Sequence, residues 1–248
     1  MEAIVLCAGY ATRLYPLTKN KPKPLLKIGG IPIIGHIIKK IESIDGISGI
    51  NVVTNDRFYK QFSEWKNECR INKPLTILND GTTSNENKLG AVGDINFAIS
   101  QKNIKGDVII IAGDNLFDFG LQDAVDSFKK NNSNIIVLHD VKDKNLARNY
   151  GVVDVDESSI VKKFEEKPKN PQSTLVSTGI YIFSKKTLNL IKEYASQINN
   201  TDKIGTFLEW LHKREIVYSH VSREAWFDIG SHDQIKKAEE HYKKSNSR

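Results

Sequence analysis

The chain has 248 residues, 39% hydrophobic and 27% charged, a composition typical of a folded globular protein rather than a disordered one. The net charge is +6, but lysines alternate with acidic residues along the chain, which argues against a nucleic-acid partner. No apolar run approaches the ~20 residues that span a bilayer, no secretory leader is recognisable, and Cys7 and Cys69 lie far apart, so we expect a cytoplasmic protein without membrane contact.

Short apolar runs alternate with amphipathic runs in the first half of the sequence, which predicts strands alternating with helices. The expected strands cover residues 3–7, 50–53, 75–78 and 108–112, and the expected helices cover residues 33–44, 58–69 and 89–99. Such β-α-β repeats form a parallel sheet with helices on both faces, and ligands bind beyond the carboxyl ends of its strands. The run at 108–112 is the most apolar, so we expect it at the centre of the sheet.

Strands become more frequent after about residue 131. They are expected at residues 135–139, 151–155, 160–164, 176–183 and 216–221, with helices at 186–198, 204–213 and 235–244. We expect a mixed or antiparallel portion that supplies a second ligand wall. The predicted fold class is therefore α/β, a Rossmann-like mixed, mostly parallel sheet flanked by helices. Residues 1–248 should form a single domain, with a nucleotide-binding half (about 1–130) and an acceptor-binding half (about 131–248).

The loop after the first strand carries the first candidate site. Its small residues can present backbone N–H groups to phosphate, and Arg13 can bind phosphate oxygens through two parallel hydrogen bonds. Lys23 stands between Pro22 and Pro24, whose rings restrict the backbone and hold a point charge on a stiff segment. The alternative is an ordinary basic loop after a buried strand, and neither a Walker A nor a GxGxxG pattern is present.

The complete string is more specific than its parts. Residues 6–18 and 22–26 resemble the signature of the sugar-1-phosphate nucleotidylyltransferases, L-A-A-G-x-G-T-R-L-x-P-L-T followed by P-K-P-L-L. The resemblance implies that Arg13 and Lys23 neutralise a triphosphate. It also implies a nucleotide-binding role for the loop residues Leu6, Ala8, Gly9, Tyr10, Ala11 and Thr12. Two departures are Cys7 for a small residue and Ala11 for a glycine, whose added methyl should tighten the turn or require a negative φ.

Two aspartates are candidate metal ligands. Asp114 ends the apolar strand at 108–112, and Asp228 lies in Trp226–Ser231, which resembles the family pattern W-x-D-I-G-(T/S). A helix cap or plain aromatic packing are the alternatives for these residues. The resemblance implies that Asp114 and Asp228 bind one Mg²⁺, an ion that favours one or two carboxylates together with phosphate oxygens and water.

Three further motifs follow in the family's order: Y-G-V at residues 150–152, F-E-E-K-P at 164–168 and G-I-Y-x-F at 179–183. A strand ending in a solvated run of charges is the alternative for the second motif. The resemblance implies that Glu166 binds sugar hydroxyls, since a carboxylate accepts two hydrogen bonds, and that Lys167 holds the sugar phosphate. Gly151, Ser177 and Gly179 would lie against the sugar.

The match weakens at residues 78–91, where the base should bind. The glutamine and proline found here in many thymidylyl- and uridylyltransferases are missing, although Asn79, Leu89 and Gly90 remain candidates for nucleotide binding. A structural loop and helix start is the alternative for Leu89 and Gly90. Asn79-Asp80 resembles some cytidylyltransferases that act on phosphorylated alcohols, whereas Asn115 resembles the thymidylyltransferases. We expect dTTP or UTP with a hexose 1-phosphate, and CTP with a sugar phosphate or phosphorylated alcohol as the alternative.

The expected reaction joins a nucleoside triphosphate to a sugar 1-phosphate and releases pyrophosphate by in-line attack, without a covalent enzyme intermediate. A GT-A glycosyltransferase would usually show D-x-D, but Asp114-Asn115-Leu116 lacks the second acid. A non-catalytic nucleotide-sugar sensor is the other alternative, and the intact charged set argues against it. The resemblance also implies a homo-oligomer (dimer or tetramer) and, from the short length, no left-handed β-helix domain.

Overall fold

The computed structural model describes residues 1–197 and 201–246. The strands of the first half are β1 (Glu2–Leu6), β2 (Lys27–Ile28), β3 (Ile31–Pro32), β4 (Gly49–Thr54), β5 (Leu75–Asn79), β6 (Val108–Ala112) and β7 (Asn115–Phe117). Its helices are α1 (Ile33–Glu42), α2 (Asp56–Glu68), α3 (Gly90–Gln101) and α4 (Gln122–Asn131), with two short 3₁₀ turns, η1 (Thr12–Leu14) and η2 (Lys23–Leu25).

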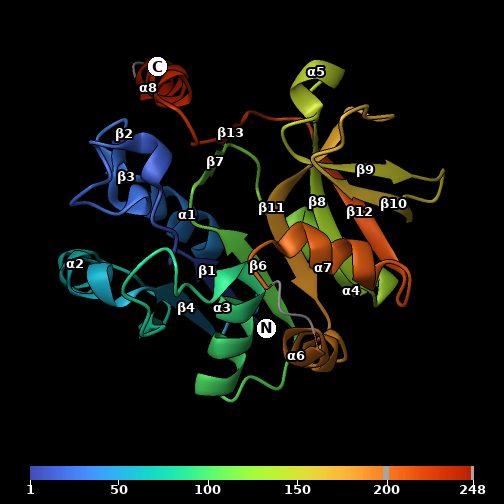
Figure 1. The fold of residues 1–248 in the computed structure, drawn as a ribbon, viewed down its shortest axis with the longest axis horizontal. Coiled ribbons are helices and arrows are strands. Elements are labelled where there is room, and N and C mark those ends of the chain that lie inside the picture. Colours follow the sequence, from blue (N-terminus) through green and yellow to red (C-terminus); the bar gives the residue numbers. More distant parts are fainter. Residues whose placement is uncertain (198–200, 247–248) are drawn as a thin grey trace.

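The second half is richer in strands, as the sequence predicts (Figure 1). Its strands are β8 (Asn134–Asp140), β9 (Gly151–Val155), β10 (Val161–Glu166), β11 (Leu175–Phe183), β12 (Val217–Ser222) and β13 (Trp226–Asp228). Its helices are α5 (Lys144–Ala147), α6 (Thr187–Gln197), α7 (Ile204–Leu211) and α8 (His232–Asn246). Residue 198, the expected end of the helix at 186–198, lies outside the described residues.

One nine-stranded sheet joins both halves of the chain. Its main path runs β10-β9-β11-β6-β1-β4-β5, and β8 pairs with both β11 and β12. Strands β6, β1, β4 and β5 are parallel, whereas β11 is antiparallel to β6. The predicted mixed, mostly parallel sheet is confirmed. So is the central position of β6, which lies between β1 and β11 with Val108–Ile111 fully buried.

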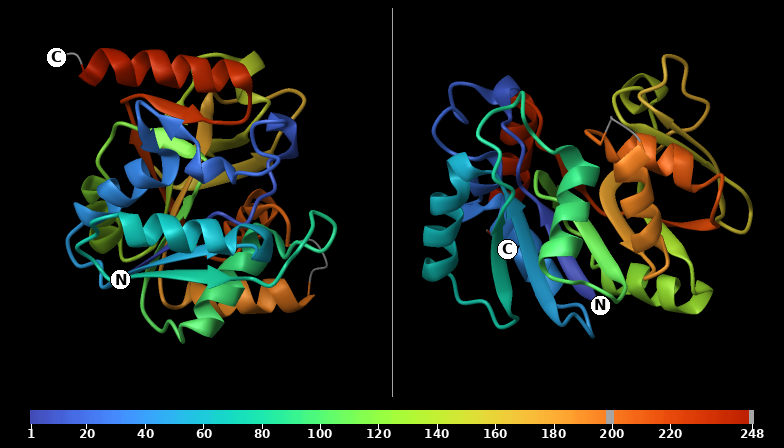
Figure 2. Two further views of the ribbon diagram at one scale, coloured as in Figure 1. Left: turned by 90° about the vertical axis from the view of Figure 1, so that its left-hand side faces the viewer. Right: turned by 60° about the horizontal axis from the view of Figure 1, so that its bottom comes forward.

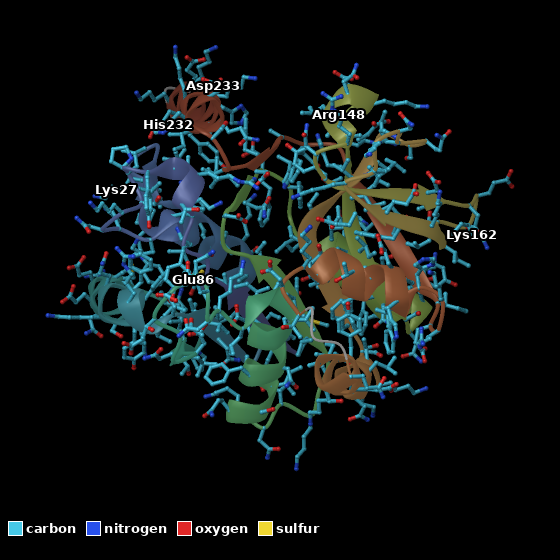
Figure 3. All side chains as sticks on the ribbon, viewed as in Figure 1. Lys27, Glu86, Arg148, Lys162, His232 and Asp233 are labelled. Carbon is cyan, nitrogen blue, oxygen red and sulfur yellow. The ribbon has the colours of Figure 1, made fainter. Side chains whose placement is uncertain are left out.

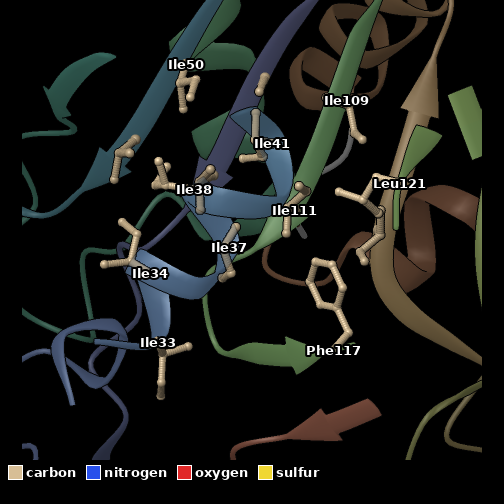
Figure 4. Close-up of a cluster of buried hydrophobic side chains, with 14 of the residues drawn as sticks. Ile33, Ile34, Ile37, Ile38, Ile41, Ile50, Ile109, Ile111, Phe117 and Leu121 are labelled. Atoms are coloured by element: carbon tan, nitrogen blue, oxygen red, sulfur yellow. The ribbon is translucent and has the colours of Figure 1, made fainter. Parts of the chain in front are cut away.

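Helices cover both faces of the sheet, because side chains alternate between the faces along each strand. On β1, Ala3 and Val5 join the core beneath α1, α2 and α4, whereas Ile4 joins the core beneath α3, α6 and α7. Figure 4 shows α1 contributing a row of isoleucines to the first of these cores. Figure 2 shows the resulting layers from two other sides.

Helix α4 was missing from the sequence-based expectation. Its buried residues Ala124, Val125 and Phe128 occur at positions i, i+1 and i+4, which is the spacing of one helical face. The signal is therefore present, but it is short and lies among charged residues. No helix among the described residues is long and apolar enough to cross a membrane.

The C-terminal helix α8 crosses back to the first half (Figures 1 and 2), although the acceptor-binding half was expected to run to residue 248. Its Glu239 Oε1 accepts a hydrogen bond from Gly29 N at 3.2 Å, and the rings of Tyr242 and His36 lie 4.7 Å apart. Charged side chains such as Lys27 and Asp233 project from the surface nearby (Figure 3).

The two-stranded sheet β7–β13 has the largest consequence for the site. It pairs Asp228 with Asn115 and Trp226 with Phe117, residues more than 100 positions apart in the chain. The second candidate metal ligand is thereby placed beside the first. Neither strand was predicted, because three-residue strands carry too little periodicity to recognise.

Candidate active site

A compact charged centre lies where β6 ends. Lys23 Nζ donates hydrogen bonds to Asp114 Oδ2 at 2.7 Å and to the carbonyl of Ile229 at 2.8 Å. Turn η2 supplies the lysine, the end of β6 supplies the aspartate, and the residue after β13 supplies the carbonyl. Three segments distant in the sequence therefore converge on one ammonium group.

The second aspartate is buried next to this ion pair. Burial first, and then the negative charge of Asp114, raise the pKa of Asp228 to about 6, although Lys23, Lys167 and Arg13 lower it. Burial is therefore the larger influence on this carboxyl group, and the adjacent carboxylate adds to it. The other three charged groups predicted for the reaction centre, and Lys167 of the F-E-E-K-P motif, are thus within electrostatic reach of Asp228.

The orientation of Asp114 is fixed by a relay of hydrogen bonds. Asn115 Nδ2 donates to Asp114 Oδ1 at 3.1 Å, and Trp226 Nε1 donates to Asn115 Oδ1 at 2.9 Å. Trp226 therefore helps to orient Asp114 through Asn115, and it also lies two residues before Asp228 in the chain. Sequence reasoning treated Asn115 only as a clue to the base.

Asp114 and Asp228 suit a magnesium ion held jointly by protein and substrate. Two neighbouring carboxylates repel each other, and a divalent cation between them removes that cost. Across residues 1–197 and 201–246, no group of three or more His, Cys, Asp or Glu side chains forms a closed metal site. Mg²⁺ prefers one or two carboxylates together with phosphate oxygens and water, and the pair Asp114 and Asp228 fits that preference.

A cleft of about 500 Å³ opens above the loop that follows β1. Most residues predicted to bind nucleotide line it: Leu6, Ala8, Gly9, Tyr10, Ala11, Thr12, Arg13, Lys23 and Gly90. Asp114, Asp228 and Lys167 line the same cleft. The side chains predicted to bind phosphate and the candidate metal ligands thus face one space.

Ala11 adopts the left-handed conformation, with φ 47° and ψ 42°. The expectation that its methyl group could demand a negative φ is wrong. Its carbonyl accepts hydrogen bonds from Leu14 N at 3.0 Å and from Thr18 Oγ1 at 2.7 Å, and these bonds hold the turn. The loop keeps the geometry for which glycine is usual, at the cost of an unfavourable alanine conformation.

Cys7 is buried and packs in the core beneath α1, α2 and α4. Burial, followed by the charges of Asp114 and Asp94, raises the pKa of its thiol well above the ordinary value, so the group stays neutral. A Cβ atom at Gly113 would collide with the Cys7 sulfur and with the carbonyl of Leu6. A glycine is therefore required immediately before Asp114.

A second cleft of about 370 Å³ holds the predicted acceptor residues. Gly151, Glu166, Lys167, Ser177 and Gly179 all line it. It shares Asp114, Asp228, Lys167, Gly179 and Tyr181 with the nucleotide cleft, so the two clefts meet at the charged centre.

A bulge in β11 opens this second cleft. The register with β8 shifts between Ser177 and Ile180, and Gly179 within the bulge has φ 77°. β8 pairs along one edge of β11. On the other edge, β9 pairs with Val176 before the bulge and β6 pairs with Ile180–Phe183 after it. The bulged residues between these two strands have no strand partner on this edge, and Ser177, Thr178 and Gly179 line the cleft there.

The backbone of the acceptor wall, which comprises Gly151, Glu166, Lys167, Ser177 and Gly179, is held by its neighbours. Glu209 Oε1 accepts a hydrogen bond from Glu166 N at 2.8 Å, and a Cβ atom at Gly205 would collide with the Glu166 carboxylate. Lys167 N donates to the Tyr150 carbonyl at 3.0 Å, which joins the F-E-E-K-P motif to Y-G-V. Glu209 and Gly205 were not singled out from the sequence.

Two candidates for nucleotide binding line neither cleft, namely Asn79 and Leu89. Asn79 Nδ2 donates to Asp56 Oδ1 at 2.7 Å, and its Oδ1 accepts from Gly81 N at 2.9 Å. Leu89 precedes α3, and its carbonyl accepts a hydrogen bond from Thr201 Oγ1 at 2.6 Å. Both residues shape the loop around the cleft. For Leu89 this agrees with the alternative interpretation of the sequence, a structural loop and helix start.

Sequence reasoning missed several residues that line the nucleotide cleft: Asn85, Lys88, Asp94, Tyr181, Asp202 and Ile204. A signal existed for Asp94, because it lies on the face of α3 that also buries Gly90 and Ala98. A carboxylate on the buried face of a helix is unusual enough to indicate a special role.

Comparison with known proteins agrees with this geometry. The nucleotidyl transferase family model matches residues 2–245. The bifunctional proteins GlmU of Methanococcus aeolicus and Methanocaldococcus jannaschii are 32% and 30% identical over 232 and 230 residues. Each alignment covers 93% of this chain and 51% of the relative, so the chain spans about half the length of these curated relatives.

Solved structures show the same fold. UDP-glucose pyrophosphorylase in complex with UDP-glucose superposes with a TM-score of 0.82 at 20% identity, covering 98% of each chain. The UDP-glucose pyrophosphorylase of Acinetobacter baumannii gives a TM-score of 0.79 at 19% identity, covering 97% of this chain and 92% of that one. With the family model matched over almost the whole sequence, the chain belongs to the nucleotidyl transferase family.

Proposed function

We propose that this protein is a sugar-1-phosphate nucleotidylyltransferase, which converts a nucleoside triphosphate and a sugar 1-phosphate into a nucleoside-diphosphate sugar and pyrophosphate. The observation that carries the proposal is the position of Lys23, Asp114 and Asp228 at the junction of two clefts. One cleft has a phosphate-binding loop and the other has a carboxylate and a lysine suited to a phosphorylated sugar. We also propose that the chain acts as one catalytic unit, because a single sheet supports both clefts.

In this reaction an oxygen of the sugar phosphate attacks the α-phosphorus and pyrophosphate leaves. Arg13 and Lys23 bind the triphosphate and offset the charge that builds on the leaving group. Asp114 and Asp228 would hold Mg²⁺, which supplies positive charge to the phosphate oxygens when bound. On the acceptor side, Glu166 accepts hydrogen bonds from sugar hydroxyls and Lys167 positions the sugar phosphate.

The chain needs no activated nucleophile for this chemistry. A phosphate monoester is already ionised near pH 7, so the attacking oxygen requires alignment and charge neutralisation rather than a general base. Cys7, the nearest thiol, is buried with a raised pKa and offers no thiolate. The rate should therefore depend on the charged residues at the junction.

The test is pyrophosphate release in the presence of Mg²⁺. ATP, CTP, GTP, UTP and dTTP are each combined with hexose 1-phosphates, choline phosphate and other phosphorylated alcohols. Release that requires both substrates, and that disappears in Asp114→Asn, supports the proposal. Sugar transfer from a nucleotide sugar without pyrophosphate release would instead indicate a glycosyltransferase.

A further inference from the structure

The C-terminal helix α8 reaches the charged centre through the half-buried side chain of Gln234. Gln234 Oε1 accepts a hydrogen bond from Gly230 N at 2.8 Å, and Gly230 lines the nucleotide cleft two residues after Asp228. A Cβ atom at Gly230 would lie 3.3 Å from Gln234 Oε1 and 3.7 Å from Asp228 Oδ2. The amide of Gln234 is therefore packed against the turn at residues 228–230, which carries the candidate metal ligand.

This turn is bonded to the other reacting groups as well. Ile229 N donates a hydrogen bond to the carbonyl of Asp114 at 3.1 Å, and the carbonyl of Ile229 accepts one from Lys23 Nζ at 2.8 Å. Both candidate metal ligands and the lysine are thus attached to the same three residues of backbone. The position of the turn therefore sets the position of the charged centre.

The same amide reaches the second cleft. The side chain of Gln234 hydrogen-bonds to that of Tyr150, which lines this cleft. Since Gln234 Oε1 accepts from Gly230 N, its Nε2 is the group that donates to the tyrosine oxygen. Burial first, and then the charge of Asp228, raise the pKa of Tyr150, whereas the hydrogen bond from Gln234 lowers it, as a donor to the oxygen should. The carbonyl of Tyr150 in turn accepts the hydrogen bond from Lys167 N at 3.0 Å.

Gln234 thus joins the turn that carries Asp228 to the residue whose backbone holds Lys167. Anchoring of α8 does not require this amide, because Ile235 and Ala238 of the same helix already pack against the core. In-line attack does require the acceptor phosphate and the α-phosphorus to be aligned, and a misplacement of about 1 Å can cost about 100-fold in rate. A side chain that bridges the two sides of the reaction is suited to keep that alignment.

Resting on the proposed function, we propose that Gln234 is a positioning residue, which fixes the charged centre relative to the acceptor wall during nucleotidyl transfer. Gln234 lines neither cleft, so it acts through Gly230 and Tyr150 rather than on the substrates. Its loss should therefore lower kcat without weakening substrate binding. Helix α8 thereby contributes to catalysis, although it lies outside both clefts.

The experiment measures kcat and KM for pyrophosphate release with the substrate pair that wild type uses fastest. Gln234→Met keeps the length of the side chain but removes both hydrogen bonds, so kcat should fall at least about tenfold, while each KM changes less than about threefold. Tyr150→Phe removes the acceptor-side bond alone, so kcat should fall by about threefold. Gln234→Met has already lost that bond, so the double variant should match Gln234→Met within about twofold.

Lys237→Met introduces the same residue at an exposed position of α8 and should behave as wild type. Gln234→Asn keeps the amide but is one methylene group shorter, so it cannot bridge both partners and should also lower kcat with little change in KM. Thermal unfolding of each variant checks the fold, and Gln234→Asn carries the test if Gln234→Met does not fold.

Three results would overturn the inference: wild-type kcat in the Gln234 variants, a loss confined to KM, or losses that multiply in the double variant. In each of these cases wild type still releases pyrophosphate, so the proposed function stands. Absence of release by wild type with every substrate pair would instead overturn the proposed function, and this inference with it.

Discussion

The two walls that flank the charged centre are built in different ways. The acceptor wall is made from strand residues of β9, β10 and β11, shaped by one bulge, and from Lys167, which follows β10. All five of its predicted residues line a single cleft. The base wall is made from a loop and the first turn of α3, and two of its three predicted residues line neither cleft.

The difference shows how firmly the position of each predicted residue is fixed in the two walls. Strand residues on the acceptor side are fixed by sheet register, so a motif there implies a position in space. Residues 79–89 are a loop whose side chains bind one another, as Asn79 binds Asp56 and Asn87 binds Thr83. In the proposed function this loop would set nucleotide choice, while the strands would keep the acceptor phosphate in place.

The largest effects are expected where the two walls meet. Lys23→Ala removes the partner of Asp114, and Asp114→Asn removes a candidate metal ligand. Each should lower kcat by at least ~100-fold, the scale of losing one preorganised charged group. Steady-state pyrophosphate release measures this, with the exposed Lys27→Ala as the control. A variant at either position with near wild-type kcat would refute these assignments.

Substitution in the acceptor wall should change the kinetics for one substrate alone, by about tenfold. Glu166→Gln keeps the shape but weakens hydrogen bonds to sugar hydroxyls, so kcat/KM for the acceptor should fall by about tenfold. The KM for the nucleoside triphosphate should stay unchanged, because Glu166 lines the acceptor cleft and not the nucleotide cleft. Equal loss for both substrates would show that the walls do not act separately.

The pH dependence of the free energy of unfolding should reveal the buried carboxyl group of Asp94. The pKa of Asp94 is about 8 in the folded chain against an ordinary 3.8, so the folded state holds the extra proton between about pH 4 and pH 8. The free energy of unfolding contributed by this group therefore falls as pH rises through that window, by up to about 1.4 kcal/mol per pH unit. Asp94→Asn cannot titrate and should lose less stability. Urea unfolding at pH 5, 6 and 7 compares the two, and parallel curves would contradict the assignment.

The smallest effect concerns the phosphate loop. Ala11 holds φ 47°, which costs alanine roughly 1 kcal/mol, so Ala11→Gly relieves strain while adding freedom to the unfolded chain. We expect a net gain of about 0.5 kcal/mol in the free energy of unfolding. Ala195→Gly within α6 should act in the opposite direction, by about 1 kcal/mol. Destabilisation by Ala11→Gly would show that the methyl group contributes packing that outweighs its strain.

The sequence was informative where local pattern and spatial position coincide. β6 is apolar along its length, so both its central place and the position of Asp114 just beyond its end could be read directly. The contact between Lys23 and Asp114 could be expected only through the family resemblance, because 91 residues separate them.

Other features had no readable signal. Strands β7 and β13 are three residues long, and their pairing depends on tertiary contacts that periodicity does not encode. The raised pKa of Asp94 depends first on burial and then on Asp80, which the loop after β5 brings to the same place only in the folded chain. Such pairs arise from topology, and single-sequence patterns do not report them.

The central claim is transfer of a nucleotidyl group at the junction of the two clefts. Mass spectrometry of the reaction mixture, with pyrophosphate quantified in parallel, tests it directly for wild type and Asp114→Asn. The account predicts one nucleoside-diphosphate-linked product formed in equal amount to pyrophosphate by wild type, and neither product from the variant. Nucleotide binding without any linked product, or release of phosphate in place of pyrophosphate, would contradict it.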